Sequence, residues 1–327
     1  MMSDDIRFYS FDLDLLYILP AVSPESGYPS VNVSQELNGS GSLEISFCDE
    51  DLKKLIRERK DNLIVVWRDF QGFVTGYKYT EKENILTGMS LSGLLHRAVI
   101  PKTEEVTGDA ETLARSAVSA NIPWLTLGTI QGFTKEIKYS TDKYISADTY
   151  IQELLKLDNG GYKITADIPN KKYVFECIKS SPSELIISES ELNAHSFETV
   201  YTNKNLAFGG WYLKEQPEDK DGNKVDPVWT YKTLDSAKTG VYKIDTVLSA
   251  VNDTEAENEL KALTAEYTVS AETKDITHNT DYRLGDIVRV QNDGITQKKI
   301  IKGINMWNEN GYGEEPVFSE LEEDTNE

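Results

Sequence analysis

Short runs of hydrophobic residues, several alternating with polar ones, mark the first hundred residues. Alternation is typical of a strand with one buried face, and a short continuous apolar run fits a strand buried on both faces. Strands of this length and spacing favour a small barrel or sandwich. The predicted strands cover residues 8–19, 43–47, 63–67, 70–77 and 85–89, and an amphipathic helix, capped by Asp49 or Asp51, covers 49–62.

The pattern then changes to apolar residues at helical spacing. We expect helical segments over 90–100, 109–120 and 146–157, with Asp109 capping the second. Asn159-Gly160-Gly161 ends the third, because glycine accepts the left-handed conformation at a helix C-terminus. Strands 162–168 and 172–178 follow as a hairpin. Residues 104–192 are thus predicted to form a small α+β module.

The last third of the chain returns to strand patterns. A polar loop is expected at 215–226, a helix at 256–271 and a glycine-rich turn at 308–313. The predicted strands are 199–201, 206–212, 228–234, 281–290, 296–306 and 316–318. The predicted class is α+β, mainly β. Its parts are a β-barrel domain (1–103), the α+β insertion (104–192), a second β-barrel domain with one helix (193–319) and an acidic tail (320–327).

Composition limits the function classes. The chain has 327 residues, enough for two or three domains, and a formal net charge of −21. That charge argues against a nucleic-acid-binding surface, which needs Lys and Arg to neutralise phosphates, and against docking on anionic lipid. It remains compatible with a conduit that DNA crosses without sticking, or with simple solubility.

Cysteine content and the N-terminus indicate the compartment. Cys48 and Cys177 lie in apolar, strand-like contexts, so we expect two buried free thiols rather than a disulfide. No signal peptide is visible, and no apolar run approaches the ~18 residues of a membrane span. Synthesis and folding in a reducing cytoplasm without membrane insertion are therefore expected, which does not exclude release in a particle.

Candidate catalytic residues are few. His96, His195 and His278 have no second histidine at metal-ligand spacing, and no nucleophile elbow surrounds Cys48 or Cys177. A carboxylate pair of the glycosidase kind stays open only because 55 acidic residues supply many pairs by chance. No enzyme activity, catalytic residue or cofactor is predicted.

Two further patterns can be interpreted either as ligand-binding sites or as purely structural features. The stretch from Asp219 to Asp226 resembles a calcium loop, but its glycine stands too early and the bidentate Glu is missing, so an exposed hairpin tip is preferred and no metal is predicted. Exposed tryptophans can stack on sugars, although core or interface anchoring is commoner. The five tryptophans are Trp67, Trp124, Trp211, Trp229 and Trp307.

Three segments, in this order, resemble passages of bacteriophage tail hub and tail-tip proteins. The first is a strand followed by a Gly-x-Ser-Leu turn and Leu-Leu-x-Arg. The second is a helix leading to Gly-Tyr, and the third is a Tyr-x-Leu-Gly-Asp-x-Val strand start. In this chain they read Gly88-Met89-Ser90-Leu91 with Leu94-Leu95-His96-Arg97, Tyr150-Ile151-Gln152-Glu153-Leu154-Leu155 to Gly161-Tyr162, and Tyr282-Arg283-Leu284-Gly285-Asp286-Ile287-Val288. The arginine-rich stretch common in that family is replaced here by the acidic loop after Gly210.

The resemblance implies two small β-barrels with an α+β insertion, assembled as a homotrimer that continues the hexameric tail tube. It implies distal tail, tail tube, tape-measure and spike or fibre proteins as partners, and DNA that passes through without specific binding. The implied location is a virion tail or phage-derived particle, after synthesis in a bacterial cytoplasm. The Gly285-Asp286 turn is expected to start a barrel strand, with Tyr282 and Trp307 packed nearby. The alternatives are a cell-wall-degrading tail enzyme and a carbohydrate- or receptor-binding tail module.

Overall fold

The chain divides into two compact units. The computed structural model describes residues 4–21, 29–59, 63–80, 84–141, 143–203, 206–215, 225–263, 266–292, 295–308, 311–319 and 321. The larger unit comprises Met1–Phe197 and Ser270–Glu327, and the smaller comprises Glu198–Val269. The predicted boundaries at 103/104 and 192/193 remain a prediction.

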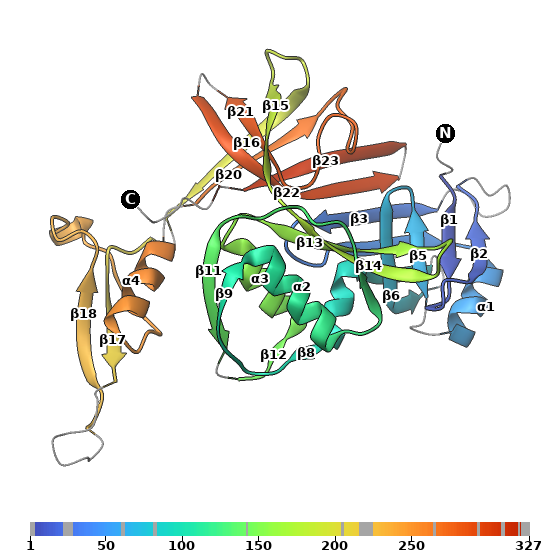
Figure 1. The fold of residues 1–327 in the computed structure, drawn as a ribbon. Helices are drawn as coiled ribbons and strands as arrows, with labels where there is room; N and C mark the ends of the chain where they lie inside the picture. Colours follow the sequence, from blue (N-terminus) through green and yellow to red (C-terminus); the bar gives the residue numbers. More distant parts are fainter. Residues whose placement is uncertain are drawn as a thin grey trace. The chain divides into compact units, whose positions relative to one another are not determined.

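An eleven-stranded sheet forms the framework of the larger unit (Figure 1). Along the sheet lie β15 (Ser181–Ser188), β21 (Asp286–Asn292), β22 (Ile295–Asn308), β3 (Ser30–Glu36), β4 (Ser42–Phe47), β7 (Asn84–Ser90), β6 (Phe70–Tyr79), β5 (Ile64–Trp67), β1 (Ile6–Tyr9) and β2 (Leu15–Leu19), while β23 (Tyr312–Ser319) also pairs with β22. The mainly β, α+β class is confirmed. All the sheets formed by the described residues, including this one, are open, and none closes into a barrel.

The long strand β22 joins the two ends of the chain. Its first half pairs with β21 and its second half with β3, both antiparallel. On its other side β22 pairs with β23 from Ile300↔Ser319 to Asn308↔Tyr312. N-terminal and C-terminal strands therefore share one hydrogen-bonded sheet, whose buried side chains include Ile301 and Ile304.

The middle of the chain supplies an α+β layer (Figure 1). Its elements are the 3-10 helix η1 (Leu91–Arg97), β8 (Val99–Ile100), β9 (Thr103–Asp109), α2 (Ala110–Asn121), β10 (Leu125–Leu127), β11 (Glu136–Thr141), β12 (Ile145–Ser146), α3 (Ala147–Lys156), β13 (Gly161–Asp167) and β14 (Lys172–Ile178). The predicted hairpin is confirmed as β13–β14. Helices α2 and α3 pack with this hairpin around one apolar core, in which the Tyr162 and Phe175 rings stack with centroids 6.0 Å apart.

Local side-chain chemistry begins and ends the helices. Asp49 accepts a hydrogen bond from the Leu52 backbone N–H at 2.7 Å before α1 (Glu50–Arg59), and Asp109 accepts one from Thr112 at 2.8 Å before α2. Both carboxylates thus satisfy N–H groups that a helix start leaves unpaired. After α3 the left-handed residue is Asn159, at φ 48, rather than a glycine as predicted. The next N–H, on Gly160, closes the turn onto Leu155.

The smaller unit is a three-stranded sheet covered by one helix. Its elements are β17 (Gly209–Lys214), β18 (Val228–Thr233), the 3-10 helix η2 (Gly240–Tyr242), β19 (Asp245–Val247) and α4 (Asp253–Ala262). β17 is central, antiparallel to β18 and parallel to β19. Its apolar core is formed by Ala207, Tyr212, Leu248, Ala250, Ala256 and Leu260. The paired strands β16 (Ala194–Thr202) and β20 (Glu266–Thr273) span the division between the units.

Several predicted elements are corrected by the structure. The single strand expected at 8–19 is a hairpin of β1 and β2, because the Ser10 carbonyl accepts from the Leu13 N–H and Leu13 adopts φ 60. The segment 90–100 is a 3-10 helix followed by the short strand β8. The strand expected to begin at residue 281 starts at Asp286, after a turn.

The predicted helix at 256–271 is also wrong in extent. α4 ends at Ala262, and β20 begins at Glu266. Tyr267-Thr268-Val269 supplies aromatic and β-branched residues, which favour a strand over a helix. Strand β3, the strands β9 to β12, and β15 and β19 were not predicted at all.

Candidate assembly surfaces

Ser40, His96 and Asp148 form a chain of polar contacts in the larger unit. Ser40 Oγ lies 3.3 Å from His96 Nε2, and His96 Nδ1 lies 2.9 Å from Asp148 Oδ2. Asp148 is buried at the start of α3 and also accepts a hydrogen bond from the Ser146 hydroxyl. The order of atoms is that of a serine hydrolase triad, in which an oriented imidazole takes the proton of a serine. Sequence reasoning missed this cluster because its members lie far apart in the chain.

The surroundings of Ser40 do not support acyl transfer. A serine nucleophile needs an N–H donor beside it to stabilise the oxyanion, commonly that of the following residue. Here the Gly41 N–H already donates to Ser90 Oγ at 3.1 Å. None of the three clefts of this unit, of about 790, 510 and 410 Å³, includes Ser40 or His96 in its lining. These polar contacts therefore have a structural role: they hold the β3–β4 turn, η1 and α3 together.

The other sequence-derived candidates lie in separate places. Cys177 is buried, and that burial raises the pKa of its thiol to about 12, which leaves it protonated and unreactive near neutral pH. Cys48 is free but exposed, which corrects the expectation that both thiols are buried, because it follows the end of β4. Nothing is described for the side chain of His195. No three His, Cys, Asp or Glu side chains of the described part of the chain gather as a metal would require.

The loop that resembles a calcium site falls outside the described residues, apart from Val225 and Asp226. The prediction that it is an exposed hairpin tip therefore stays a prediction. Of the helices in the described ranges, none combines the length and the apolar character needed to cross a bilayer.

The Gly285-Asp286 turn starts β21, as the sequence suggested. Gly285 adopts φ +91, a conformation that favours glycine, and its N–H donates to Ile301 O at 2.9 Å. Asp286 accepts from the Arg283 N–H at 2.8 Å and thereby closes the turn. Tyr282 is buried beside it, while Trp307 lies against Gly313 in the β22–β23 hairpin. These contacts fix strand geometry.

His278 lies buried next to this turn. Burial holds the pKa of its imidazole below the ordinary value, while the carboxylates of Glu314 and Asp69 act in the opposite direction. Its ring centroid is 5.9 Å from that of Tyr282, and its backbone N–H donates to Glu314. The imidazole is therefore a neutral packing residue near neutral pH.

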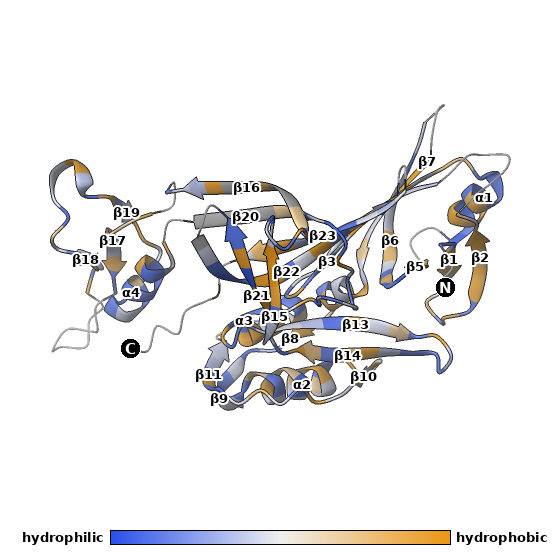
Figure 2. Ribbon diagram, turned by 90° about the horizontal axis from the view of Figure 1, so that it is seen from above, coloured by the Kyte–Doolittle hydropathy of each residue, from blue (hydrophilic) through white to orange (hydrophobic). Residues whose placement is uncertain are grey.

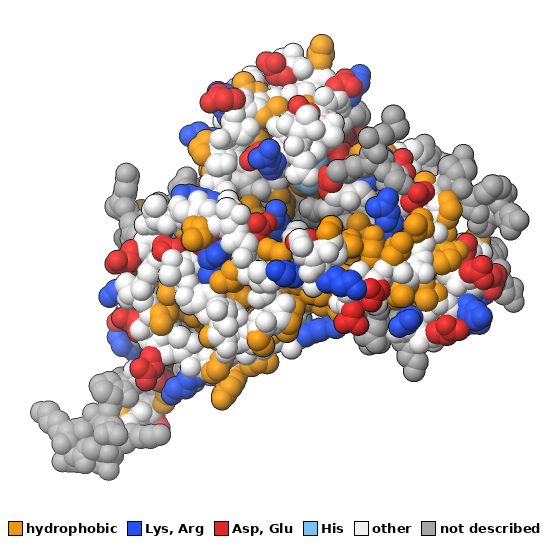
Figure 3. Space-filling model, turned by 45° about the vertical axis from the view of Figure 1, so that its right-hand side comes forward, with side chains coloured by type: hydrophobic (Ala, Val, Ile, Leu, Met, Phe, Trp, Pro, Cys, Tyr) orange, Lys and Arg blue, Asp and Glu red, His pale blue; other side chains and the backbone are white. Residues whose placement is uncertain are grey.

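Three clefts indent the larger unit. The first, about 790 Å³, is lined by residues of β3, α3 and β22, among them Glu36, Gln152 and Lys302. Another, about 510 Å³, lies beside α2. The third, about 410 Å³, carries both signs of charge, including the ion pair of Lys163 and Glu176 at 3.3 Å. Figure 3 shows hydrophobic side chains intermingled with acidic and basic ones on one face of the molecule. None of these clefts presents a marked excess of one charge that would select an ion.

Strand β2 forms one end of the large sheet and is apolar along its length (Figure 2). Leu15 and Ile18 on this strand are exposed. A terminal strand with unpaired backbone groups is a template for another strand, and proteins usually protect such edges with charge or a covering segment. β2 is thus a candidate contact surface.

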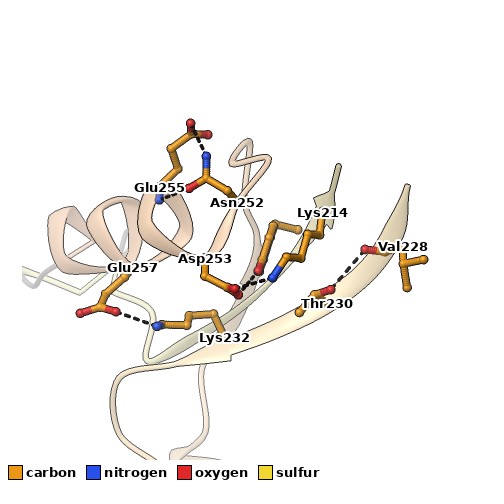
Figure 4. A network of polar contacts seen from close by, with 9 residues as sticks. Lys214, Val228, Thr230, Lys232, Asn252, Asp253, Glu255 and Glu257 are labelled. Atoms are coloured by element: carbon orange, nitrogen blue, oxygen red, sulfur yellow. Dashed lines mark hydrogen bonds and ion pairs between the residues drawn. The ribbon is translucent and has the colours of Figure 1, made fainter. Parts of the chain in front are cut away.

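The smaller unit has one covered and one uncovered sheet face. On the covered face, Lys214 and Tyr212 contact Asp253, and Lys232 pairs with Glu257 at 2.6 Å (Figure 4). Register places a second set of side chains on the opposite face, because directly paired residues point the same way. That set, called the aromatic face below, comprises Trp211, Leu213, Trp229, Tyr231 and Val247.

Comparison with known proteins supports a phage tail fold. No protein-family model matches the sequence, and no curated protein is similar to it. Solved structures do match. Prophage tail protein gp18 of Listeria monocytogenes EGD-e aligns with a TM-score of 0.53 at 14% identity, over 98% of this chain and 95% of that one.

Two further tail proteins match in the same way. The 43 kDa tail protein of prophage MuSo2 from Shewanella oneidensis gives a TM-score of 0.54 at 12% identity, over 97% of this chain and 98% of that one. The tail protein of Neisseria meningitidis MC58 gives 0.52 at 13% identity, over 89% and 91%. At these identities the likeness establishes the fold. The resemblance to phage tail proteins is therefore confirmed at the level of the fold.

Proposed function

We propose that this chain is a structural, non-enzymatic hub at the distal end of a phage or prophage-derived tail. The observation that carries the proposal is the fold match to gp18 and to the MuSo2 tail protein, which extends over nearly the full length of all three chains.

In this proposal three copies form a ring that continues the tail tube, built from the strand-rich segments 1–103 and 193–319, with the α+β insertion 104–192 between them. Distal tail and tape-measure proteins attach on one side, and spike or fibre proteins on the other. The net charge of −21 suits walls past which DNA moves without binding. The exposed edge strand β2 offers a backbone template for contacts between copies.

Light scattering across a concentration series, with and without the adjacent tail proteins, tests the proposal. The expected result is a mass of three chains, either alone or when a partner is added. A chain that stays monomeric in every mixture would remove the hub proposal.

Binding of a receptor glycan is the second candidate, because Trp211 and Trp229 expose two indoles on one sheet face. A glycan array is the direct test, and a zymogram on diverse cell walls addresses the wall-degrading alternative. Silence in both assays, together with trimer formation, is what a plain hub would give.

A further inference from the structure

The aromatic face is an uncovered apolar surface on a folded sheet. The side chains of Trp211, Trp229 and Val247 are 46%, 56% and 69% exposed, and that of Leu213 is 40% exposed. At about 250 Å² for a fully exposed tryptophan, the two indoles alone leave roughly 250 Å² of apolar surface in contact with solvent. With their neighbours they approach the upper range of apolar patches on monomeric proteins, about 300–600 Å². The largest apolar patch of a monomeric protein is often functional, which makes this face a candidate interaction site.

Polar groups at the margin of the aromatic face are already satisfied by one another. The Tyr231 hydroxyl donates to Asp245 Oδ1 at 2.9 Å, and the Lys243 ammonium pairs with Asp245 at 2.6 Å. The same ammonium lies 4.6 Å from the centroid of the Tyr231 ring and covers one side of it. A sugar needs open ring faces and free donors or acceptors for its hydroxyls. This arrangement therefore favours an apolar protein surface over a glycan.

Charge indicates which protein surface fits. The chain carries a net charge of −21, so most surfaces of one copy repel those of another. On the aromatic face, the charged side chains we describe are Lys243 and Asp245, which cancel each other. A second copy of this acidic chain can approach there without bringing like charges together.

We propose that the aromatic face is a contact surface between neighbouring copies of this chain, an inference that rests on the proposed trimer. Three-fold symmetry makes such a contact head-to-tail, so the face meets a different surface of its neighbour rather than its own counterpart. Two such surfaces of roughly 500 Å² each would bury about 1,000 Å², the lower limit for a specific interface. The aromatic face thus contributes to the ring alongside other contacts.

The test compares three variants with the wild type by sedimentation, in the mixture in which the wild type is trimeric. W211T/W229T removes both indoles and keeps strand-forming residues, and V247K places a charge at a highly exposed position of the same face. W124T is the matched control, since Trp124 is 44% exposed in the larger unit and its ring contacts that of a tyrosine, Tyr173, as the ring of Trp211 contacts that of Tyr231. Circular dichroism establishes that each variant is folded.

We expect W211T/W229T and V247K to weaken self-association at least tenfold, with W124T equal to the wild type. Unchanged association of both face variants overturns this inference and leaves the hub intact. If W211T/W229T loses glycan binding but associates as the wild type does, the aromatic face binds a sugar, and this inference is overturned as well. A monomeric wild type in every mixture overturns the proposed function and, with it, this contact.

Discussion

Glu111 shows at the scale of one residue how a buried charge organises this fold. Its side chain is 2% exposed, and its carboxylate accepts hydrogen bonds from the backbone N–H groups of Gln131 at 2.8 Å and Gly132 at 2.7 Å, with Phe133 at 3.4 Å. Glu111 thereby holds the segment between β10 and β11 to α2, where Arg115 Nη1 also donates to the Gly128 carbonyl at 3.0 Å. A carboxylate that takes several N–H groups replaces the hydration it loses on burial.

The E111Q variant turns one acceptor oxygen into a donor that faces other donors. We expect it to lower the free energy of unfolding by about 2–3 kcal/mol, because hydrogen bonds to a charged group are among the stronger ones. E105Q, at an exposed position on β9, is the control and should change little. Denaturant unfolding measures both, and equal stability of the two variants would contradict this role of Glu111.

His278 makes the stability of the larger unit depend on pH. Since burial lowers the pKa of its imidazole, the folded state favours the neutral ring. The resulting stabilisation is complete above the unfolded pKa of about 6.5 and is lost as the pH falls through that value toward the folded pKa. H278Q should flatten the stability profile in that range. Burial raises the pKa of the Asp286 carboxyl, so its protonation at more acidic pH stabilises the folded state. The two groups therefore change the stability in opposite directions and can be told apart.

Ser40 offers a direct test of the tie that resembles a hydrolase triad. Because the Gly41 N–H already donates to Ser90, we expect a fluorophosphonate probe to label Ser40 no faster than its neighbour Ser42. Mass spectrometry of the treated protein reads out both positions. Selective labelling of Ser40 that disappears in H96A would show a reactive serine and reopen the enzyme alternative.

At the scale of elements, α4 depends on its N-terminal cap. Asn252 Oδ1 accepts from the Glu255 N–H at 2.9 Å (Figure 4). The Glu255 carboxylate in turn accepts from the Val251 N–H at 3.0 Å. This reciprocal pair satisfies two donors at the helix start. N252A should reduce the protection of the α4 amides in hydrogen exchange by the equivalent of about 1 kcal/mol, whereas N252D keeps an acceptor and should change little. Equal protection in N252A and wild type would show that packing alone holds the helix.

Local chemistry explains which elements the sequence predicts well. Asp49, Asp109 and the 172–178 strand pattern give signals within a few residues, and the corresponding elements form as expected. Two elements predicted wrongly, 8–19 and 256–271, contain a change of backbone conformation that the apolar pattern does not reveal. A leucine at φ 60 bends the segment 8–19, and apolar spacing continues from α4 into β20 although the backbone changes from helix to strand.

The aromatic face could not be predicted because it depends on pairing between distant segments. Trp211 and Trp229 are visible as tryptophans in the sequence, but the register Trp211↔Tyr231 and Leu213↔Trp229 decides that they share a face. Val247 joins them through β19, a strand of three residues with no detectable pattern. The Ser40, His96 and Asp148 cluster was missed for the same reason.

At the scale of the whole molecule, charge and apolar surface act against each other. Identical copies with a net charge of −21 repel, while the aromatic face and the β2 edge offer contacts that do not need charge. Raising the ionic strength from about 0.01 M to about 0.15 M shortens the Debye length from ~30 Å to ~8 Å. Repulsion between copies is then largely screened, and apolar contacts are not weakened.

Self-association should therefore tighten over this range of sodium chloride, and sedimentation across the series measures the change. The W211T/W229T variant should show the same dependence from a weaker starting affinity, because screening acts on the whole chain and the indoles act only at the contact. If salt instead weakens association, opposite charges must meet across the interface. The contact would then lie on a charged surface of this chain, away from the aromatic face.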